Sequence, residues 1–175
     1  MKTNNILKYT VRLILASLII AIGFYLYPEK LLPENIKIDS LVVYKSKKRM
    51  LAISNGKCIK TYKISIGRNP IGKKEYEGDN KTPEGKYIIN DKNPNSGFHK
   101  NLGISYPNES DIDNAKKLGK PTGGDVKIHG LKNGLGIFDK LHYWFTTRGC
   151  IRVTNSEVDE LYNAVPIGTP IEIYP

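Results

Sequence analysis

The chain has 175 residues and a formal net charge of +10, a length that suits one domain around a single core better than two. Its many glycines and prolines, with little helical patterning, favour a β-rich fold with many turns. The basic residues are scattered lysines without a recognisable nucleic-acid-binding module, so they indicate an anionic cell wall, an anionic membrane face or a plain solubilising surface, and no nucleic acid partner.

An apolar segment, VRLILASLIIAIGFYLY, occupies residues 11–27. Its length is near the lower limit for a membrane span, about 17 residues. Lys2, Lys8 and Arg12 precede or begin it, so the positive-inside rule places the N-terminus in the cytoplasm. A cleaved signal peptide is the alternative, and either one exports the rest. We expect a cytoplasmic tip and an anchor (or uncleaved signal) in residues 1–30, a linker at 31–38 and a catalytic domain at 39–175.

Three strand-like runs follow: LVVYKS at 41–46, RMLAIS at 49–54 and KCIKTYKISIG at 57–67. Asn55-Gly56 between the second and third is a strong two-residue hairpin signal, so these runs predict an antiparallel meander. Residues 67–82 are polar and glycine-rich and predict a loop.

The middle of the chain alternates short apolar runs with polar stretches. We predict strands at 86–90, 102–106 and 125–129, a polar loop at 91–101 and a short helix at 110–118. Ser110 can cap the start of that helix and Gly119 its end.

The C-terminal stretch carries the clearest pattern. After a short strand at 151–153, Thr154 and Glu157 have the spacing of a capping box. The apolar residues that follow then share one helical face, Pro166 ends the helix, and residues 169–174 predict a closing strand.

Two residues stand out for chemistry. His129 ends an apolar strand beside Gly130, where it can face a cleft, and Cys150 follows Gly149 between Arg148 and Arg152. Positive charge favours a thiolate, and exposed backbone N–H groups near a glycine can hold an oxyanion. Since a cysteine nucleophile needs a base within hydrogen-bond reach, His129 and Cys150 form a candidate pair.

Other uses of these residue types have less support. The chain has no Cys-x-x-Cys and no His-x-x-x-His, so a zinc site or a thioredoxin-like redox site is not indicated. His99 and His142 lie in polar or mixed surroundings. Cys58 lies in an alternating run and is expected to be an ordinary strand residue rather than half of a disulfide framework.

The segment Ile128-His129-Gly130, followed by Thr147-Arg148-Gly149-Cys150-Ile151-Arg152, resembles the signature of the L,D-transpeptidase catalytic domain family. The turn Thr82-Pro83-Glu84-Gly85 and the closing helix and strand are also similar to that family. The resemblance covers about residues 39 to 174. Many members carry histidine where this chain has Arg148, so no second histidine role is carried over.

The resemblance implies a fold and a set of roles. The fold would be mainly β with short helices, an L,D-transpeptidase-type mixed β-sandwich, preceded here by one transmembrane helix. Cys150 would be the nucleophile and His129 the general base and then acid, oriented by the Gly130 carbonyl. The oxyanion would bind near Gly149. Substrate contacts would come from three further residues, Thr147, Arg148 and Arg152.

The reaction implied is transfer of a peptidoglycan stem peptide from terminal D-alanine to Cys150, and then to an amine, giving a 3–3 crosslink or attachment of a protein. The alternatives are an L,D-carboxypeptidase or amidase that uses water, and a non-catalytic, membrane-tethered wall-binding module. No metal or organic cofactor is implied. The expected partners are stem peptides, the cytoplasmic membrane and an outer-membrane lipoprotein, for a monomer working on the periplasmic side.

Overall fold

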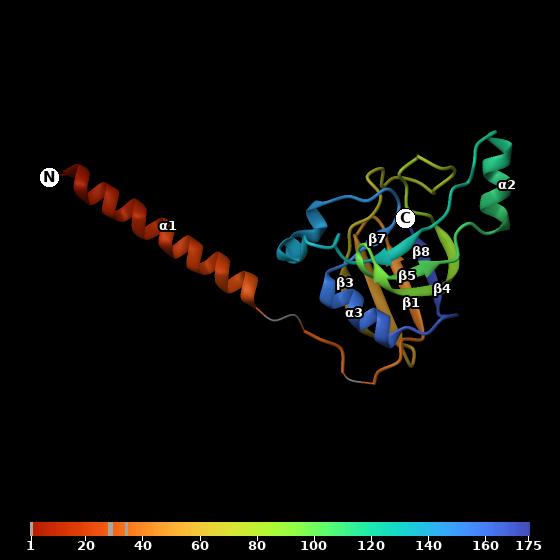
Figure 1. Ribbon diagram of the computed structural model, residues 1–175, viewed down its shortest axis with the longest axis horizontal. Coiled ribbons are helices and arrows are strands. Elements are labelled where there is room, and N and C mark those ends of the chain that lie inside the picture. Colours follow the sequence, from red (N-terminus) through yellow and green to blue (C-terminus); the bar gives the residue numbers. More distant parts are fainter. Residues whose placement is uncertain (1, 28–29, 34) are drawn as a thin grey trace. The chain divides into compact units, whose positions relative to one another are not determined.

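The computed structural model describes residues 2–27, 30–33 and 35–175 (Figure 1). The chain divides into two compact units, Met1–Lys30 and Leu31–Pro175. Met1 and residues 28–29, which belong to the expected tip and to the end of the expected anchor, lie outside the described residues.

The first unit is one helix, α1 (Lys2–Leu26). Its window Ile6–Gly23 has a mean hydropathy of 1.9, and none of it is buried against protein. The predicted apolar helix is therefore confirmed, and its length and composition suit a membrane span or a signal sequence.

The first half of the sheet forms around the predicted meander. β1 (Ser40–Tyr44), β2 (Arg49–Ser54) and β3 (Lys57–Lys63) pair antiparallel. Asn55 and Gly56 both have positive φ, 50° and 72°, as a two-residue hairpin of this kind requires. The predicted hairpin is confirmed. The closing strand β8 (Pro170–Tyr174) lies between β1, to which it is parallel, and β4.

The second half of the sheet is built by β4 (Gly85–Ser96), β5 (His99–Ile104), β6 (Lys127–His129) and β7 (Ile151–Arg152). The full order is β3-β2-β1-β8-β4-β5-β6-β7. The predicted polar loop at 91–101 is wrong, because β4 continues to Ser96 and pairs with β5. The strands of this hairpin pair through their backbones, and side chains that face solvent need not be apolar. Its polar residues therefore show no apolar alternation from which a strand could be predicted.

The two ends of the sheet curve toward each other. Ser65, just beyond β3, forms a bridge with Arg152 of β7. Two backbone hydrogen bonds of 2.9 Å, from Ser65 N to Arg152 O and from Arg152 N to Ser65 O, close this contact. The mixed sheet is thus bent into a half-barrel (Figure 1), and β7 has a backbone partner on each side.

Three short helices complete the second unit. α3 (Asn155–Ala164) begins with the predicted capping box of Thr154 and Glu157 and packs on β5 and β6. α2 (Glu109–Lys117) is capped by Asn108 rather than by Ser110: the Asn108 side chain accepts from the Asp111 N–H, and the Asp111 carboxylate accepts from the Asn108 N–H. The 3-10 helix η1 (Gly136–Trp144) is not indicated by the sequence pattern.

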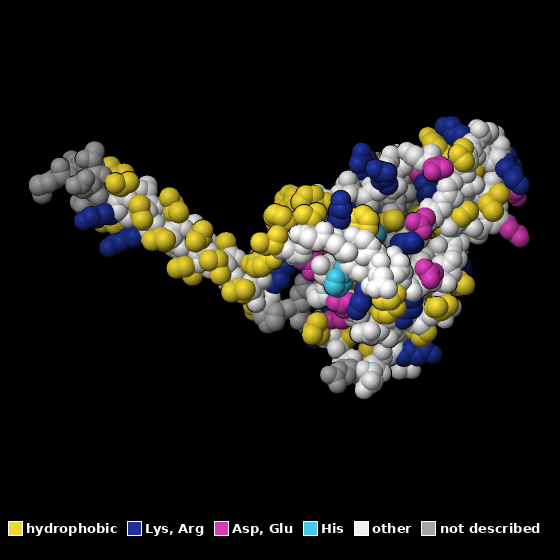
Figure 2. All heavy atoms as spheres, viewed as in Figure 1, with side chains coloured by type: hydrophobic (Ala, Val, Ile, Leu, Met, Phe, Trp, Pro, Cys, Tyr) yellow, Lys and Arg dark blue, Asp and Glu magenta, His cyan; other side chains and the backbone are white. Residues whose placement is uncertain are grey.

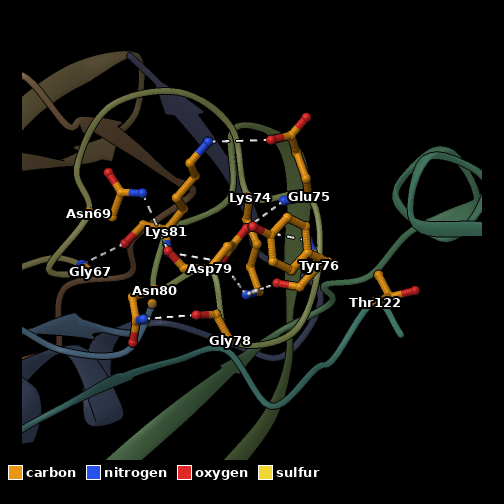
Figure 3. Close-up of polar contacts among 12 residues, drawn as sticks. Gly67, Asn69, Lys74, Glu75, Tyr76, Gly78, Asp79, Asn80, Lys81 and Thr122 are labelled. Atoms are coloured by element: carbon orange, nitrogen blue, oxygen red, sulfur yellow. Dashed lines mark hydrogen bonds and ion pairs between the residues drawn. The ribbon is translucent and has the colours of Figure 1, made fainter. Parts of the chain in front are cut away.

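The loop between β3 and β4 is organised by one buried carboxylate (Figure 3). Asp79 accepts hydrogen bonds from Lys74 Nζ at 2.8 Å and from three backbone N–H groups at 2.7 to 3.3 Å, those of Glu75, Tyr76 and Lys81. Its side chain is 1% exposed. Four donors on one carboxylate fix the path of residues 74–81, since each would lose its acceptor if the loop opened.

This loop also touches the chain near the candidate cysteine. Lys81 O lies so close to Gly149 that a Cβ there would stand 2.8 Å from it. Gly149 has φ +138°, in the region that favours glycine. Asp79 therefore fixes the loop backbone that packs against Gly149, the residue that precedes Cys150.

The ionisation of Asp79 ties loop order to pH. Burial alone would raise the pKa of this carboxyl, but the hydrogen bonds from Lys74 and the backbone outweigh burial and hold the pKa below its ordinary value. A carboxyl with a lowered folded pKa contributes stability above its unfolded pKa, about 3.9, and loses it as pH falls through the folded value.

We predict that Asp79→Asn lowers the free energy of unfolding by about 1.5–3 kcal/mol at pH 7. The amide is uncharged and has one acceptor oxygen, so it cannot replace all four hydrogen bonds of the carboxylate. The difference from wild type should shrink below about pH 4. Urea unfolding at both pH values measures it. Asp113→Asn on the exposed face of α2 is the matched control. Equal losses in the two variants would contradict the assigned role of Asp79.

Candidate active site

Strand alternation places four chemically active side chains on one surface. Ile128 of β6 lies opposite Ile151 of the parallel strand β7, and both side chains are fully buried. Their sequence neighbours point to the other face, because successive side chains in a strand alternate. A cavity of about 610 Å³ on that face is lined by all four neighbours: Lys127, His129, Cys150 and Arg152.

The cavity is strongly basic. Arg68, Lys127, Arg148 and Arg152 line it against a single carboxylate, Asp125. Asp125 Oδ1 is paired with Lys127 Nζ at 2.7 Å. The remaining positive charge favours ligands that carry carboxylates.

His129 is held in one orientation at the end of β6. Its side chain is 7% exposed, and its Nδ1 lies 2.6 Å from Gly130 O. Because a carbonyl oxygen can only accept, Nδ1 carries the hydrogen and Nε2 is left as an acceptor. Gly130 fits here because a Cβ would stand 2.4 Å from Asn155 Oδ1.

The environment keeps the His129 ring neutral. Burial, which is the largest cause, and the charges of Arg152 and Lys127 together lower its pKa to about 4, although the hydrogen bond to Gly130 opposes them. An imidazole with this pKa is unprotonated at neutral pH and can accept a proton.

Cys150 is also uncharged at rest. Its partly buried Sγ donates to Asp125 O at 3.7 Å. Burial raises the pKa of the thiol, and the backbone of Lys127 and the charges of Lys127 and Arg152 lower it only in part. The charge of Arg152 favours the thiolate, as its sign predicts, but burial outweighs it. In the described part of the chain no hydrogen bond joins Sγ to His129, although both line the same cavity.

The turn before Cys150 is fixed by Thr147. The Gly149 N–H donates to Thr147 Oγ1 at 3.1 Å, and that hydroxyl donates to Cys150 O at 2.6 Å. Backbone hydrogen bonds of Thr147 with Ile66 and Arg68 hold the turn against the loop after β3. Gly149 thus uses its own N–H inside the turn. The N–H of Cys150 has no acceptor among the described residues.

Two buried polar atoms of the cavity lining have no hydrogen-bond partner among the described residues. They are Arg152 Nε and Asn101 Oδ1, and both residues line the cavity. Arg152 also donates from Nη1 to Phe145 O at 3.5 Å, whereas Arg148 is exposed. Asn101 lies opposite His129 in the β5–β6 pair. Sequence reasoning missed Asn101 because it fell in the expected polar loop.

The other candidates lie elsewhere. His99 Nε2 is 3.0 Å from both carboxylate oxygens of Asp159, and the His142 ring contacts the carbonyls of Asp139 and Lys63; neither histidine lines this cavity. Cys58 is an exposed, free thiol in β3. Within the described residues no cluster of three His, Cys, Asp or Glu side chains is placed to hold a metal ion.

Known proteins resemble this chain in sequence. Residues 38–173 match the family model YkuD, described as the L,D-transpeptidase catalytic domain. The protein YafK of Escherichia coli (strain K12), whose name assigns it provisionally to the L,D-transpeptidases, is 29% identical over 124 residues. That match covers 66% of this chain and 43% of YafK.

Solved structures share the fold. The helical cell shape determining protein Pgp2 of Campylobacter jejuni is 28% identical with a TM-score of 0.58, over 79% of this chain and 48% of Pgp2. An L,D-transpeptidase of Xylanimonas cellulosilytica, at 17% identity and a TM-score of 0.50 over 83% of this chain and 65% of its own, shows the fold alone. This chain spans about half the length of YafK and Pgp2 or less.

The sequence resemblance is confirmed by the family model, and the mainly β fold with short helices is confirmed by the structure and its neighbours. The chain belongs to the L,D-transpeptidase catalytic domain family.

Proposed function

We propose that this protein is a cysteine acyltransferase that acts on peptidoglycan stem peptides, with Cys150 as the nucleophile and His129 as the base. One observation carries the proposal. A thiol and a neutral imidazole, whose Nδ1 hydrogen bond leaves Nε2 as an acceptor, line one basic cavity: His129 ends β6, and Cys150 directly precedes the adjacent parallel strand β7.

The first half-reaction loads the enzyme. Sγ attacks the carbonyl that links the third stem residue to terminal D-alanine, while the thiol proton passes to His129 Nε2. The Cys150 N–H is the available backbone donor for the oxyanion. As the tetrahedral intermediate collapses, the C–N bond breaks, His129 returns the proton to the leaving amine, and D-alanine departs. A thioester on Cys150 remains.

The second half-reaction passes the acyl group on. An acceptor amine attacks the thioester, His129 takes a proton from the amine, and the sulfur leaves and is protonated again. An amine of another stem gives a 3–3 crosslink. An amine of a protein, such as an outer-membrane lipoprotein, gives attachment to the wall. Water gives an L,D-carboxypeptidase, and attack on a protein–wall linkage gives an amidase.

The cavity offers polar contacts for such a substrate. Arg152 Nε can donate to a carboxylate or a peptide carbonyl, and Asn101 Oδ1 can accept a peptide N–H, so binding would satisfy two buried atoms that lack partners. Arg148, exposed at the rim, can pair with a second acidic group. Thr147 contributes by holding the turn.

We place the reaction on the extracytoplasmic side of the cytoplasmic membrane. In this organisation residues 1–30 form the anchor, 31–38 the linker and 39–175 a monomeric catalytic domain. The apolar span at Ile6–Gly23 and the family of the second unit support it. Pgp2 is described as determining helical cell shape. On this basis we extend the proposal for the present chain to a role in cell shape.

We predict that a carbapenem acylates the wild-type protein once and that Cys150→Ala takes up none, because no other thiol faces the cavity. Intact-protein mass spectrometry measures the adduct. Cys58→Ser is the matched control and should be acylated like wild type, since Cys58 is an exposed residue of β3. Folded, reduced wild-type protein without an adduct would support a non-catalytic wall-binding module instead.

His129→Gln should slow acylation by roughly 10²-fold or more, because the amide keeps polarity but cannot take the thiol proton. The rate of adduct formation under single-turnover conditions measures this. His142→Gln and His99→Gln should acylate at near wild-type rates. Equal slowing in all three variants would point to a general loss of packing rather than a lost base.

The pH profile of acylation should be flat around neutrality and should fall only as pH approaches about 4, where His129 is protonated. Because the pKa is lowered, the neutral base persists to more acidic pH than for a free histidine, whose pKa is about 6.5. Short carbapenem pulses at each pH, with circular dichroism to check folding, give the profile. A limb centred near pH 6.5 would contradict the buried, neutral imidazole.

A further inference from the structure

The segment 135–145 presents an unusual concentration of exposed apolar side chains. Trp144 is 73% exposed and Phe145 50%. We call the apolar residues exposed along this segment the η1 patch: Leu135, Ile137, Phe138, Leu141, Trp144 and Phe145. Figure 2 shows hydrophobic side chains gathered over this part of the second unit, with basic side chains at the margin. Contiguous apolar patches of this kind mark contacts with a partner or a membrane.

The backbone beneath the patch is fixed, so the exposure is built into the fold. His142 is buried and its Nε2 contacts Lys63 O at 2.8 Å. Ser65 Oγ donates to His142 O at 2.6 Å. Asp139 accepts the N–H of Asn155 at 2.7 Å at the start of α3. The polar side of η1 is therefore attached to the sheet and to α3, and its apolar side chains are left on the outside.

Lysines lie beside the patch, while Asp139, the acidic residue of η1, is turned toward the start of α3. Lys132 is exposed in the turn before η1, and Lys63 lies 3.5 Å above the ring of Tyr143. Aromatic side chains with lysines beside them are typical of surfaces that sit at the headgroup level of a bilayer, where the rings enter the boundary and the ammonium groups meet anionic lipid.

A small ligand would cover the patch only in part. A cavity of about 320 Å³ beside it is lined by residues that include Phe98, Leu135 and Phe138. Leu141 and Trp144 lie outside that lining. A peptide held in this cavity would leave the most exposed ring uncovered, whereas a flat lipid surface can cover the whole patch.

The connection between α1 and the second unit is short enough to keep the second unit close to a membrane that α1 spans. α1 ends at Leu26 and the second unit begins at Leu31. A fully extended connection of this length spans only about 17 Å. The proposed linker at 31–38 is itself packed on that unit, since the Leu32 N–H donates to Glu160 Oε1 and Ile38 is fully buried. With α1 in the bilayer, the second unit stays close to the membrane surface, and any exposed apolar face on it meets lipid at high effective concentration.

We propose that the η1 patch docks on the anionic surface of the bilayer that α1 spans, with Trp144 and Phe145 at the headgroup level. The inference rests on the membrane anchoring proposed above. Phe145 accepts from Arg152 Nη1 and is followed directly by the turn at 146–149. Docking would thus fix how the catalytic cavity faces the membrane.

Trp144 provides the measurement, because it is the single tryptophan of the chain. The full-length protein is reconstituted in vesicles of phosphatidylcholine and phosphatidylglycerol, with or without bromine on the acyl chains. We expect a blue shift of the Trp144 emission and loss of intensity in brominated vesicles. Vesicles of phosphatidylcholine alone should give weaker quenching, since the lysines then lack an anionic partner.

Variants test whether the patch as a whole carries the contact. Phe138→Ser and Leu141→Ser should reduce the quenching, because less apolar area enters the lipid. Ile71→Ser is the matched control, since Ile71 is 82% exposed in the loop after β3 and lies outside the patch. Carbapenem adduct formation on Cys150 in each variant checks that the catalytic unit is folded.

Flotation separates the two proposals. A chain that fails to float with the vesicles overturns the anchoring and this inference together. A chain that floats, but whose Trp144 is not quenched by brominated lipid, overturns the docking alone and leaves the anchor in place. Emission that shifts only when soluble peptidoglycan fragments are added would assign the patch to the substrate and would also overturn the docking.

Discussion

The parallel pairing of β6 with β7 is the constraint on which the rest of the site depends. Both strands are very short, so their own hydrogen bonds would not hold them. β5 supports β6 on one side, and Ser65 supports β7 on the other. Only in this register do Ile128 and Ile151 both enter the core while the side chains that flank them share a cavity.

Burial sets the chemistry of that cavity more than its charges do. Four cations line the cavity, yet the Cys150 thiol has a raised pKa and the His129 imidazole a lowered one, because burial penalises both ions. The resting pair is neutral. In the proposed reaction, proton transfer therefore accompanies attack on the substrate, and the surrounding cations would stabilise the negative charge that develops on sulfur and on the oxyanion.

The features that could be predicted from the sequence are those that depend on local patterns of residues. The Asn55-Gly56 hairpin and the Thr154 capping box depend on a few adjacent residues, and the His129–Cys150 pair was found through a family signature. The β4–β5 hairpin escaped because its residues are polar, and η1 because its apolar face is not buried. Asn101 and the pKa of Cys150 depend on burial by distant segments, which no local pattern records.

Two glycines allow close packing beside the proposed base and nucleophile. A side chain at Gly130 would strike Asn155 of α3, and one at Gly149 would strike Lys81 of the loop that Asp79 orders. Side-chain atoms of α3 and the backbone of the loop after β3 therefore pack directly against the residues next to His129 and Cys150. This close packing fixes the backbone beside the proposed nucleophile and base, whereas Arg68 and Arg148 line the same cavity with exposed side chains.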